Sequence, residues 1–261
     1  MHSNITTGKK ILTAMCLLYL LCLQANSQLN NNDTLNWQIK LSASGSLLDG
    51  NVSRFLLVNR LEVAYAQPSW GMSTRNDYQY GTTRHIKTEN DFVSYNFLYA
   101  TPLKKLYPYV MGLVETNFRR KIRFRYQIGP GVSYNLSAKG NNLIRVAVNS
   151  TYEHTRFGGT KFENVPDSLS NIINVWRVTG RLFVRQHVFE NKLRLICEFW
   201  WQQSVSDNRN YRFYNEEILE LPLNKNFSFR TGLRYTYETV RLKGLKPYDL
   251  FWTFGLTLSN Y

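Results

Sequence analysis

Arginine and glutamate residues recur along this chain, and many of them alternate with apolar residues. Arg177, Arg181 and Arg185 are four residues apart, and Arg123 and Arg125 are two apart. Guanidinium groups gathered in one place either bind anions or pair with carboxylates and so hold a structure together. The candidate residues for such a site are Arg123, Arg125, Arg145, Arg177, Arg181, Arg185, Arg230, Arg234, Glu198, Glu216 and Glu238.

The element that positions these side chains is a long β-strand. In residues 122–136 every even position is apolar or aromatic, and every odd position is polar or glycine. A strict period of two is typical of a strand with two chemically opposite faces. About 15 residues at ~3.3 Å each, tilted by about 40°, cross the hydrocarbon and both interfaces of a bilayer.

Eleven further segments alternate in a similar way, so the sequence predicts an all-β protein: a closed antiparallel transmembrane β-barrel of about twelve strands within residues 36–261. Segment 211–221 is the least regular, and a barrel of ten strands is the alternative. An even number of strands closes without a free edge. A soluble sandwich or lipocalin-like barrel explains neither the strand lengths nor their number. The predicted strands are 37–44, 54–66, 70–80, 93–99, 110–119, 122–136, 144–153, 176–185, 193–202, 211–221, 227–238 and 248–261.

The connections between these segments are unequal. The turns near residues 68, 103, 139, 190 and 224 are short and fall on one side of the predicted barrel. Longer polar segments, including 157–171, fall on the other side. Short periplasmic turns and longer outer loops are typical of outer-membrane barrels.

The first residues are typical of an export signal. Lys9 and Lys10 precede an apolar core at 11–23, and small residues at 25–27 form an acceptable cleavage site. We therefore expect a signal peptide at 1–27 and a short periplasmic tail at 28–35. Cys16 and Cys22 leave with the signal, so Cys197 remains alone and no internal disulfide can form.

Export followed by amphipathic strands predicts the outer membrane of a Gram-negative bacterium. Residues 253–261 form a last strand that ends on Tyr261, and this ending resembles the signal read by the barrel-insertion machinery, although Asn260 stands where an aromatic residue is usual. The expected partners are that machinery, outer-membrane lipid and lipopolysaccharide. Nothing in the sequence sets an oligomeric state.

The formal charge of the chain is +14, and it falls to +12 when Lys9 and Lys10 are removed with the leader. A basic balance favours anionic partners. Nucleic acid is not expected among them, because the arginines alternate with apolar residues along strands and are not clustered in a loop or a helix.

The alternation places the candidate arginines and glutamates on the inner face. Twelve strands about 4.8 Å apart and tilted by about 40° enclose a backbone cylinder roughly 24 Å wide, which side chains narrow to about 10 Å or less. Two interpretations of such a lumen stay open. Ion pairs can close it, giving a structural or envelope-stress barrel, or the excess of arginine can form a narrow pore for small anionic solutes.

A third hypothesis, an outer-membrane lipid hydrolase, has little support. His154 and His187 fall on opposite faces by parity, and neither a G-x-S-x-G motif nor a metal-binding H-x-x-x-H spacing is present. We expect no enzyme activity, no catalytic residue, no metal site and no cofactor.

Residues 37–261 resemble a family of uncharacterised salt-induced outer membrane proteins, a domain of unknown function in exported bacterial proteins. The resemblance rests on short motifs: Gly50-Asn51, Tyr78-x-Tyr80-Gly81, Thr88-Glu89-Asn90, and Gly129-Pro130-Gly131 followed by Tyr134. It implies an outer-membrane barrel and transfers no catalytic residue.

Overall fold

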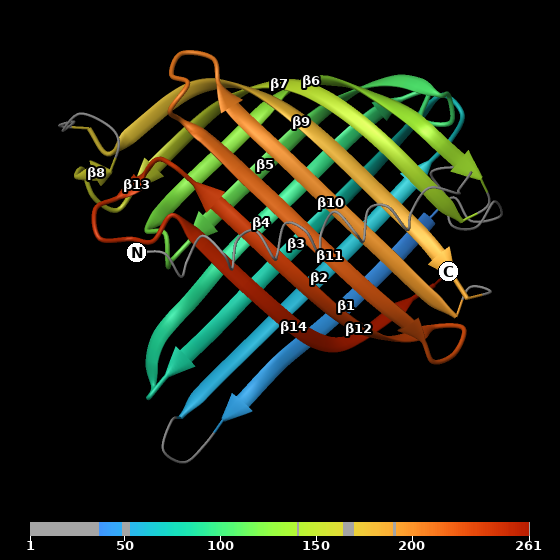
Figure 1. The fold of residues 1–261 in the computed structure, drawn as a ribbon, viewed down its shortest axis with the longest axis horizontal. Coiled ribbons are helices and arrows are strands. Elements are labelled where there is room, and N and C mark those ends of the chain that lie inside the picture. The colour runs from blue at the N-terminus through green and yellow to red at the C-terminus, as the bar shows by residue number, and fades with distance from the viewer. Residues whose placement is uncertain (1–36, 49–52, 140, 164–169, 190–191, 261) are drawn as a thin grey trace, which may run out of the picture.

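Twelve long strands form a closed antiparallel barrel (Figure 1). The computed structural model describes residues 37–48, 53–139, 141–163, 170–189 and 192–260, so the predicted signal peptide and periplasmic tail lie outside the described residues. The barrel strands are β1 (Trp37–Leu48), β2 (Arg54–Ala66), β3 (Trp70–Thr83), β4 (Ile86–Ala100), β5 (Leu106–Asn117), β6 (Ile122–Lys139), β7 (Asn142–Phe157), β9 (Ile172–Val188), β10 (Leu193–Ser204), β11 (Tyr211–Pro222), β12 (Phe227–Glu238) and β14 (Tyr248–Ser259).

The predicted closed barrel of twelve strands is confirmed, and the alternative of ten is wrong. The segment with the least regular alternation forms β11, which pairs along its length with β10 and β12. The ring closes where β1 pairs with β14, from Lys40 opposite Ser259 to Ser44 opposite Gly255. We call the end that carries Trp37 and Ser259 the terminus end, and the opposite end the loop end.

The outer wall is apolar over most of its height because successive side chains of a strand point to opposite faces. On β14, for example, Leu250, Trp252 and Phe254 point outward and are half or more exposed. Aromatic rings flank this belt at both ends: Trp37 packs on Tyr65 at the terminus end, and Tyr152 packs on Trp176 at the loop end. Such a belt is typical of a wall that faces lipid.

No helix within the described ranges is long and apolar enough to cross a membrane.

The loop end carries a small sheet that the sequence analysis did not predict. The segment expected to be the longest loop contains β8 (Phe162–Glu163), which pairs with β13 (Arg241–Leu242) from the connection between β12 and β14 (Figure 1). Phe162 and Leu242 are buried with Ile122, Phe157 and Val240 in a common apolar cluster. Two connections far apart in sequence are therefore fastened to each other and to the rim of the barrel.

Two glycines on the inner face of β6 shape the wall there. A side chain at Gly131 would lie 2.6 Å from the ring of Tyr109, so its absence makes room for that ring. A side chain at Gly129 would collide with the backbone carbonyl of Ser150 on β7. The pairing of β6 with β7 is interrupted between Ile128 and Gly131, which lets the strands approach closely at this point.

The apolar cluster at the loop end can be tested without disturbing the barrel. Phe162→Ala removes a ring packed against Phe157 at a centroid distance of 5.0 Å, and we expect this to cost about 3–5 kcal/mol of local stability. The barrel should stay folded, migrating as a compact band in unboiled gels, while limited proteolysis cuts within 158–171 or 239–247. Phe189→Ala, which changes an exposed phenylalanine at the terminus end, is the control. An unchanged proteolysis pattern for Phe162→Ala would contradict the role given to the cluster.

Candidate functional site in the barrel lumen

Ten of the eleven candidate residues point into the barrel, and Arg123 does not. The pairing of β6 with β7 shifts between Ile122 and Phe124, and this bulge reverses the faces of the residues before it. Ile122 is consequently buried, and Arg123 is exposed. The placement of Arg123 in the lumen was wrong because unbroken alternation was assumed up to the end of the strand. The ten that face the lumen are Arg125, Arg145, Arg177, Arg181, Arg185, Arg230, Arg234, Glu198, Glu216 and Glu238.

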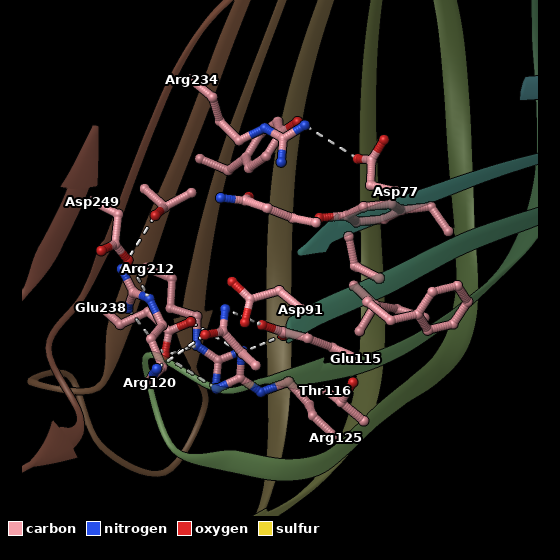
Figure 2. A pocket seen from close by; sticks show the side chains of 18 of the residues that line it. Asp77, Asp91, Glu115, Thr116, Arg120, Arg125, Arg212, Arg234, Glu238 and Asp249 are labelled. Atoms are coloured by element: carbon pink, nitrogen blue, oxygen red, sulfur yellow. Dashed lines mark hydrogen bonds and ion pairs between the residues drawn. The ribbon is translucent and has the colours of Figure 1, made fainter. Parts of the chain in front are cut away.

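Near the loop end, arginines and carboxylates form a dense network (Figure 2). Glu153 is fully buried and receives hydrogen bonds from Arg177 Nε at 2.8 Å and from Arg212 Nη1 and Nη2 at 2.7 and 2.6 Å. Arg125 donates to Glu115 at 2.7 Å and to Glu238 at 3.0 and 3.1 Å. The pairs Arg125–Glu238 and Glu153–Arg212 join strands that are not neighbours in the ring, so the network crosses the lumen as well as lining it.

Arg119 and Arg120, from the connection between β5 and β6, extend this network toward the rim. Arg119 pairs with Asp91 at 2.8 Å, and Arg120 pairs with Asp249 at 2.8 Å. Every cation of the loop-end network has a carboxylate partner, and the two signs balance. The cations are Arg119, Arg120, Arg125, Arg177 and Arg212, and the anions are Asp91, Glu115, Glu153, Glu238 and Asp249.

A second layer of ion pairs lies halfway along the lumen. Arg60 donates to both oxygens of Asp77 and, at 2.7 and 2.9 Å, to both oxygens of Glu216. Arg234 donates to the same two carboxylates at 3.2 and 3.0 Å. Glu198 is shared by Arg75 at 2.7 Å and by Arg181, whose Nε donates to it at 2.6 Å. This layer holds four arginines and three carboxylates.

The terminus end differs, because cations outnumber carboxylates there. Glu220 is contacted by Lys40 at 2.5 Å, Arg194 at 3.1 Å and Arg230 at 3.5 Å. Glu62, the other carboxylate of this region, lies 4.0 Å from Lys40. Arg145 and Arg185 also line this part of the lumen. Among the described residues of this region, five cationic side chains therefore face two carboxylates.

Arg145 has an unusual environment. It is only 7% exposed, and among the described residues it forms no ion pair with a carboxylate. Its Nε donates to Asn135 at 3.0 Å, while its Nη2 is buried without a hydrogen-bond partner. The guanidinium lies over the rings of Tyr107 and Phe183 at 5.7 and 5.9 Å. A buried guanidinium with an unused donor favours an anion as its missing partner.

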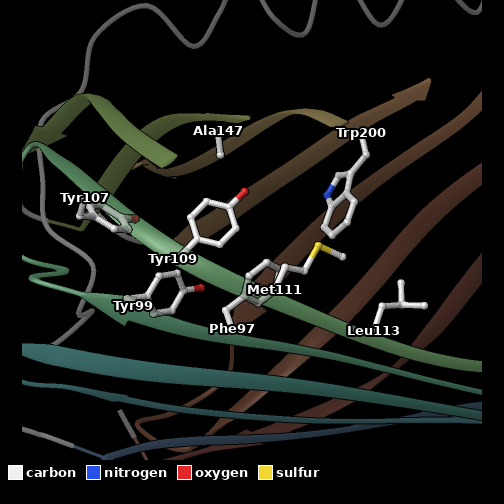
Figure 3. Packing of buried hydrophobic residues seen from close by; sticks show 8 residues of the cluster. All are labelled: Phe97, Tyr99, Tyr107, Tyr109, Met111, Leu113, Ala147 and Trp200. Atoms are coloured by element: carbon white, nitrogen blue, oxygen red, sulfur yellow. The ribbon is translucent and has the colours of Figure 1, made fainter. Parts of the chain in front are cut away.

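An aromatic cluster on the inner wall was not anticipated (Figure 3). Alternation at 93–99 predicted an apolar face, and the structure turns that face into the lumen instead of toward lipid. Asp91, which has the same parity as Phe97 and Tyr99, was the available signal. The cluster consists of Phe97, Tyr99, Tyr107, Tyr109, Met111, Leu113, Ala147 and Trp200, with Val93, Tyr95 and Tyr214 packed against it. Arg181 lies over Phe97 and Trp200, 4.9 Å from each ring.

The side chains divide the lumen into separate cavities. One of about 120 Å³ lies toward the loop end, lined by Arg120, Arg125 and Arg212 among others. Another of about 200 Å³ lies toward the terminus end and is lined by Arg145, Arg181 and Arg185 among others. Tyr95 and Trp200 line both cavities, so these two rings and the middle layer of ion pairs separate them.

The candidate list omitted several residues that hold the networks. Arg60, Asp77, Glu153 and Arg212 each take part in an ion pair that crosses the lumen. The alternation of apolar and polar residues places these four side chains on the inner face, so the sequence contained the signal needed to select them. What alternation cannot provide is the pairing across the barrel, such as Arg60 with Glu216, because the two lie 156 residues apart.

The two histidines considered for a hydrolytic site, His154 and His187, lie on different strands of the described barrel. His154 lies on the outer wall, where it contacts Asn174 at 2.7 Å and stacks on Tyr126, and no hydroxyl of a described serine or threonine is hydrogen-bonded to it. His187 accepts a hydrogen bond from Arg194 Nε at 3.0 Å. In the part of the chain that the structure describes, no group of His, Cys, Asp or Glu side chains could hold a metal ion.

The loop-end network makes a testable contribution to stability. Glu153→Gln leaves Arg177 and Arg212 buried near each other without their shared carboxylate, and we expect the barrel to lose about 3–5 kcal/mol of unfolding free energy. Urea titration of the purified protein, followed by tryptophan fluorescence, measures this as a lower unfolding midpoint. Asp207→Asn, which breaks an exposed pair with Arg209 in a loop, should leave the midpoint unchanged. Equal midpoints for Glu153→Gln and the parent would contradict the structural role of the network.

The barrel is similar to that of the NanC porin, with a TM-score of 0.52 at 11% sequence identity over 85% of this chain and 98% of the porin chain. Other similar structures are the translocator domain of autotransporter NalP from Neisseria meningitidis (TM-score 0.46, 9% identity, 87% and 89% of the two chains) and the KdgM porin in complex with disordered oligogalacturonate (TM-score 0.45, 10% identity, 86% and 99%). At such low identity, the likeness to the NanC porin shows the fold alone.

No curated protein sequence matches this chain. The family model DUF481, described as a protein of unknown function, matches residues 41–259, which is nearly the whole of the barrel. The sequence prediction of an exported family without an assigned activity is therefore confirmed as to the family, and the chain belongs to the DUF481 family of proteins of unknown function.

Proposed function

We propose that the protein is a narrow, non-enzymatic pore of the Gram-negative outer membrane that admits small anions. The observation that carries this proposal is the uneven charge of the lumen. Cations and carboxylates balance near the loop end, but five cations face two carboxylates near the terminus end, where Arg145 has no carboxylate partner among the described residues. A purely structural interior needs no such excess, whereas an anion path does.

The apolar belt and its aromatic rims support a position across a membrane. The terminus end carries short turns, such as the one from Gln67 to Trp70. The loop end carries the two-residue turn between β3 and β4 as well as the longer connections that form the β8–β13 sheet. By analogy with outer-membrane barrels, short turns face the periplasm and longer connections face outward. The basic cavity would then open on the periplasmic side, and the balanced network would face the outside.

The middle layer sets the expected size of the solute. Its arginines and carboxylates meet across the lumen, and Tyr95 and Trp200 narrow the same region. An anion passing this layer takes the place of a carboxylate oxygen on Arg181 or Arg75, both of which share Glu198. Such an exchange suits small, singly or doubly charged solutes and predicts a low conductance.

Planar-bilayer recording of the protein purified from outer membranes tests the proposal. We expect small conductance steps and a reversal potential in a KCl gradient that shows chloride preferred over potassium. Arg145→Gln should lower the chloride permeability roughly three- to tenfold, as expected for one unit charge about 6 Å from the path at an effective dielectric constant of 40–80, and so reduce that preference. Arg181→Glu should lower it further, because it also reverses the charge.

The matched control is Arg156→Gln, which removes a charge from the same strand, β7, on its exposed outer face. This variant should conduct as the parent does. Bilayers that stay silent at every voltage would overturn the pore and favour the second candidate, a structural barrel of the cell envelope. The specific observation behind that candidate is the ion-pair layer that crosses the lumen at Arg60, Asp77 and Glu216.

A further inference from the structure

Four polar side chains interrupt the apolar outer wall at neighbouring positions of β3 and β4. Arg75 and Asp77 point inward from β3, and Phe97 points inward from β4, so the residues that alternate with them point outward. These outward residues are Thr74, Asn76, Ser94 and Asn96, which we call the amide patch. Asn96 is exposed, Thr74 and Asn76 are half-buried, and Ser94 is only 9% exposed beneath its neighbours. Asn76 pairs with Ser94 and Thr74 pairs with Asn96 across the two strands, so the four are contiguous.

The amide patch lies within the height of the apolar belt. On the outer face of β3 it is followed toward the loop end by Tyr78 and preceded toward the terminus end by Trp70. On β4 it lies between Phe92 and Leu98, which are both exposed on the outer wall. The amide patch therefore lies at the depth of the lipid chains, which offer no hydrogen bonds.

The patch satisfies only part of its own hydrogen-bonding capacity. Asn76 Nδ2 donates to Thr74 Oγ1 at 3.0 Å, and Asn96 Nδ2 donates to Ser94 Oγ at 2.9 Å. Each amide keeps a second N–H and a carbonyl oxygen, and no described residue pairs with either. Polar groups left unpaired in hydrocarbon are costly, so side chains of this kind mark places where membrane proteins contact one another.

We infer that the amide patch is the interface through which two copies of this protein form a two-fold dimer in the membrane. A carboxamide carries both a donor and an acceptor, so the patch is complementary to itself, as a two-fold interface requires. Gly112 of β5 lies directly beside Asn96, and no atom other than Asn96 Cβ lies within 4 Å of the place where a side chain would begin. This shallow, open position lets a second wall approach closely.

A head-to-tail arrangement is the main competitor, because β11 also presents polar side chains outward. Asn215 and Glu217 occupy outer positions of that strand, six places from β4 in the closed ring. Asn215 Nδ2 lies 3.4 Å from Glu217 Oε1, and its Oδ1 is buried without a hydrogen-bond partner. Asn215 is only 4% exposed, however, so its neighbours cover it and a second wall cannot reach it as it can reach the exposed Asn96. Contacts between opposite walls would also produce open rows, whereas a two-fold contact closes with two copies.

Cysteine crosslinking in outer membranes tests the dimer. Asn96→Cys places a thiol at the proposed interface, and the native Cys197 is buried, so the parent protein serves as the blank. We expect oxidation, or a short bis-maleimide, to convert at least half of the Asn96→Cys protein to a covalent dimer. Leu256→Cys, an exposed outer position of β14 four places from β4, is the matched control and should stay monomeric.

A second set of variants separates the interface from folding. The double change Asn76→Leu and Asn96→Leu suits lipid and should leave the compact gel band intact while lowering the crosslinked or sedimenting dimer at least fivefold. Gly112→Phe should do the same by blocking approach. Equal crosslinking of Asn96→Cys and Leu256→Cys would overturn the inference, and so would a covalent product that forms only between Asn96→Cys and Glu217→Cys copies. Conductance is not used as a readout, so failure of the pore leaves the dimer standing.

Discussion

The constraint on which this molecule depends is that a twelve-stranded barrel encloses many charged side chains in a narrow lumen, where most of them are buried. Each inward carboxylate of the middle and loop-end layers is therefore met by arginine, and Glu153 and Glu216 are met by more than one. Removing such charges from water is costly unless their geometry is good and their remaining hydrogen-bonding groups are used. Arginine meets this condition better than lysine, because its planar fork can donate to two carboxylates at once, as Arg60 does to Asp77 and Glu216.

Because unpaired charges in the lumen are costly, the places where ion pairing is incomplete require an explanation. The balanced layer at the loop end and the densely paired layer in the middle of the lumen join strands that are distant in the ring, and they stabilise a closed shape. The terminus end could have been balanced in the same way, but Arg145 rests on aromatic faces with one donor unused. Cation–π contacts offset part of the cost of burying that guanidinium without neutralising it. The positive potential is thus kept at the terminus end. An anion path requires this property, whereas a lumen that is only closed by ion pairs does not.

Alternation of apolar and polar residues predicts features within one strand, but it carries no information about which distant strands meet. Period two identified every barrel strand, including β11, because each strand keeps one apolar face. It underestimated β4, which spans Ile86–Ala100 where only 93–99 was predicted. It failed at Arg123, where a bulge reverses the faces, since one extra residue changes nothing in the composition of the segment. It also missed β8 and β13, whose two-residue strands are too short to show any period. Pairings across the lumen were beyond reach, because they depend on the tilt and register of strands that are far apart in the ring.

Strand β4 shows most clearly why alternation identifies a strand without assigning its faces. Its apolar set, with Tyr95, Phe97 and Tyr99, points into the lumen, and its polar set, with Ser94 and Asn96, points toward lipid. The polarity of this strand is thus inverted relative to β6 or β14. This inversion explains both the aromatic rings inside the lumen and the polar side chains on the outer wall. Inside, the inversion supplies ring faces on which Arg75 and Arg181 stack. Outside, the inversion leaves amides in the lipid belt. Their unpaired groups raise the free energy of a monomer surrounded by lipid, and a second protein wall that pairs with them lowers it. A strand that serves the lumen with aromatic rings therefore makes the adjoining outer surface a place for protein contact.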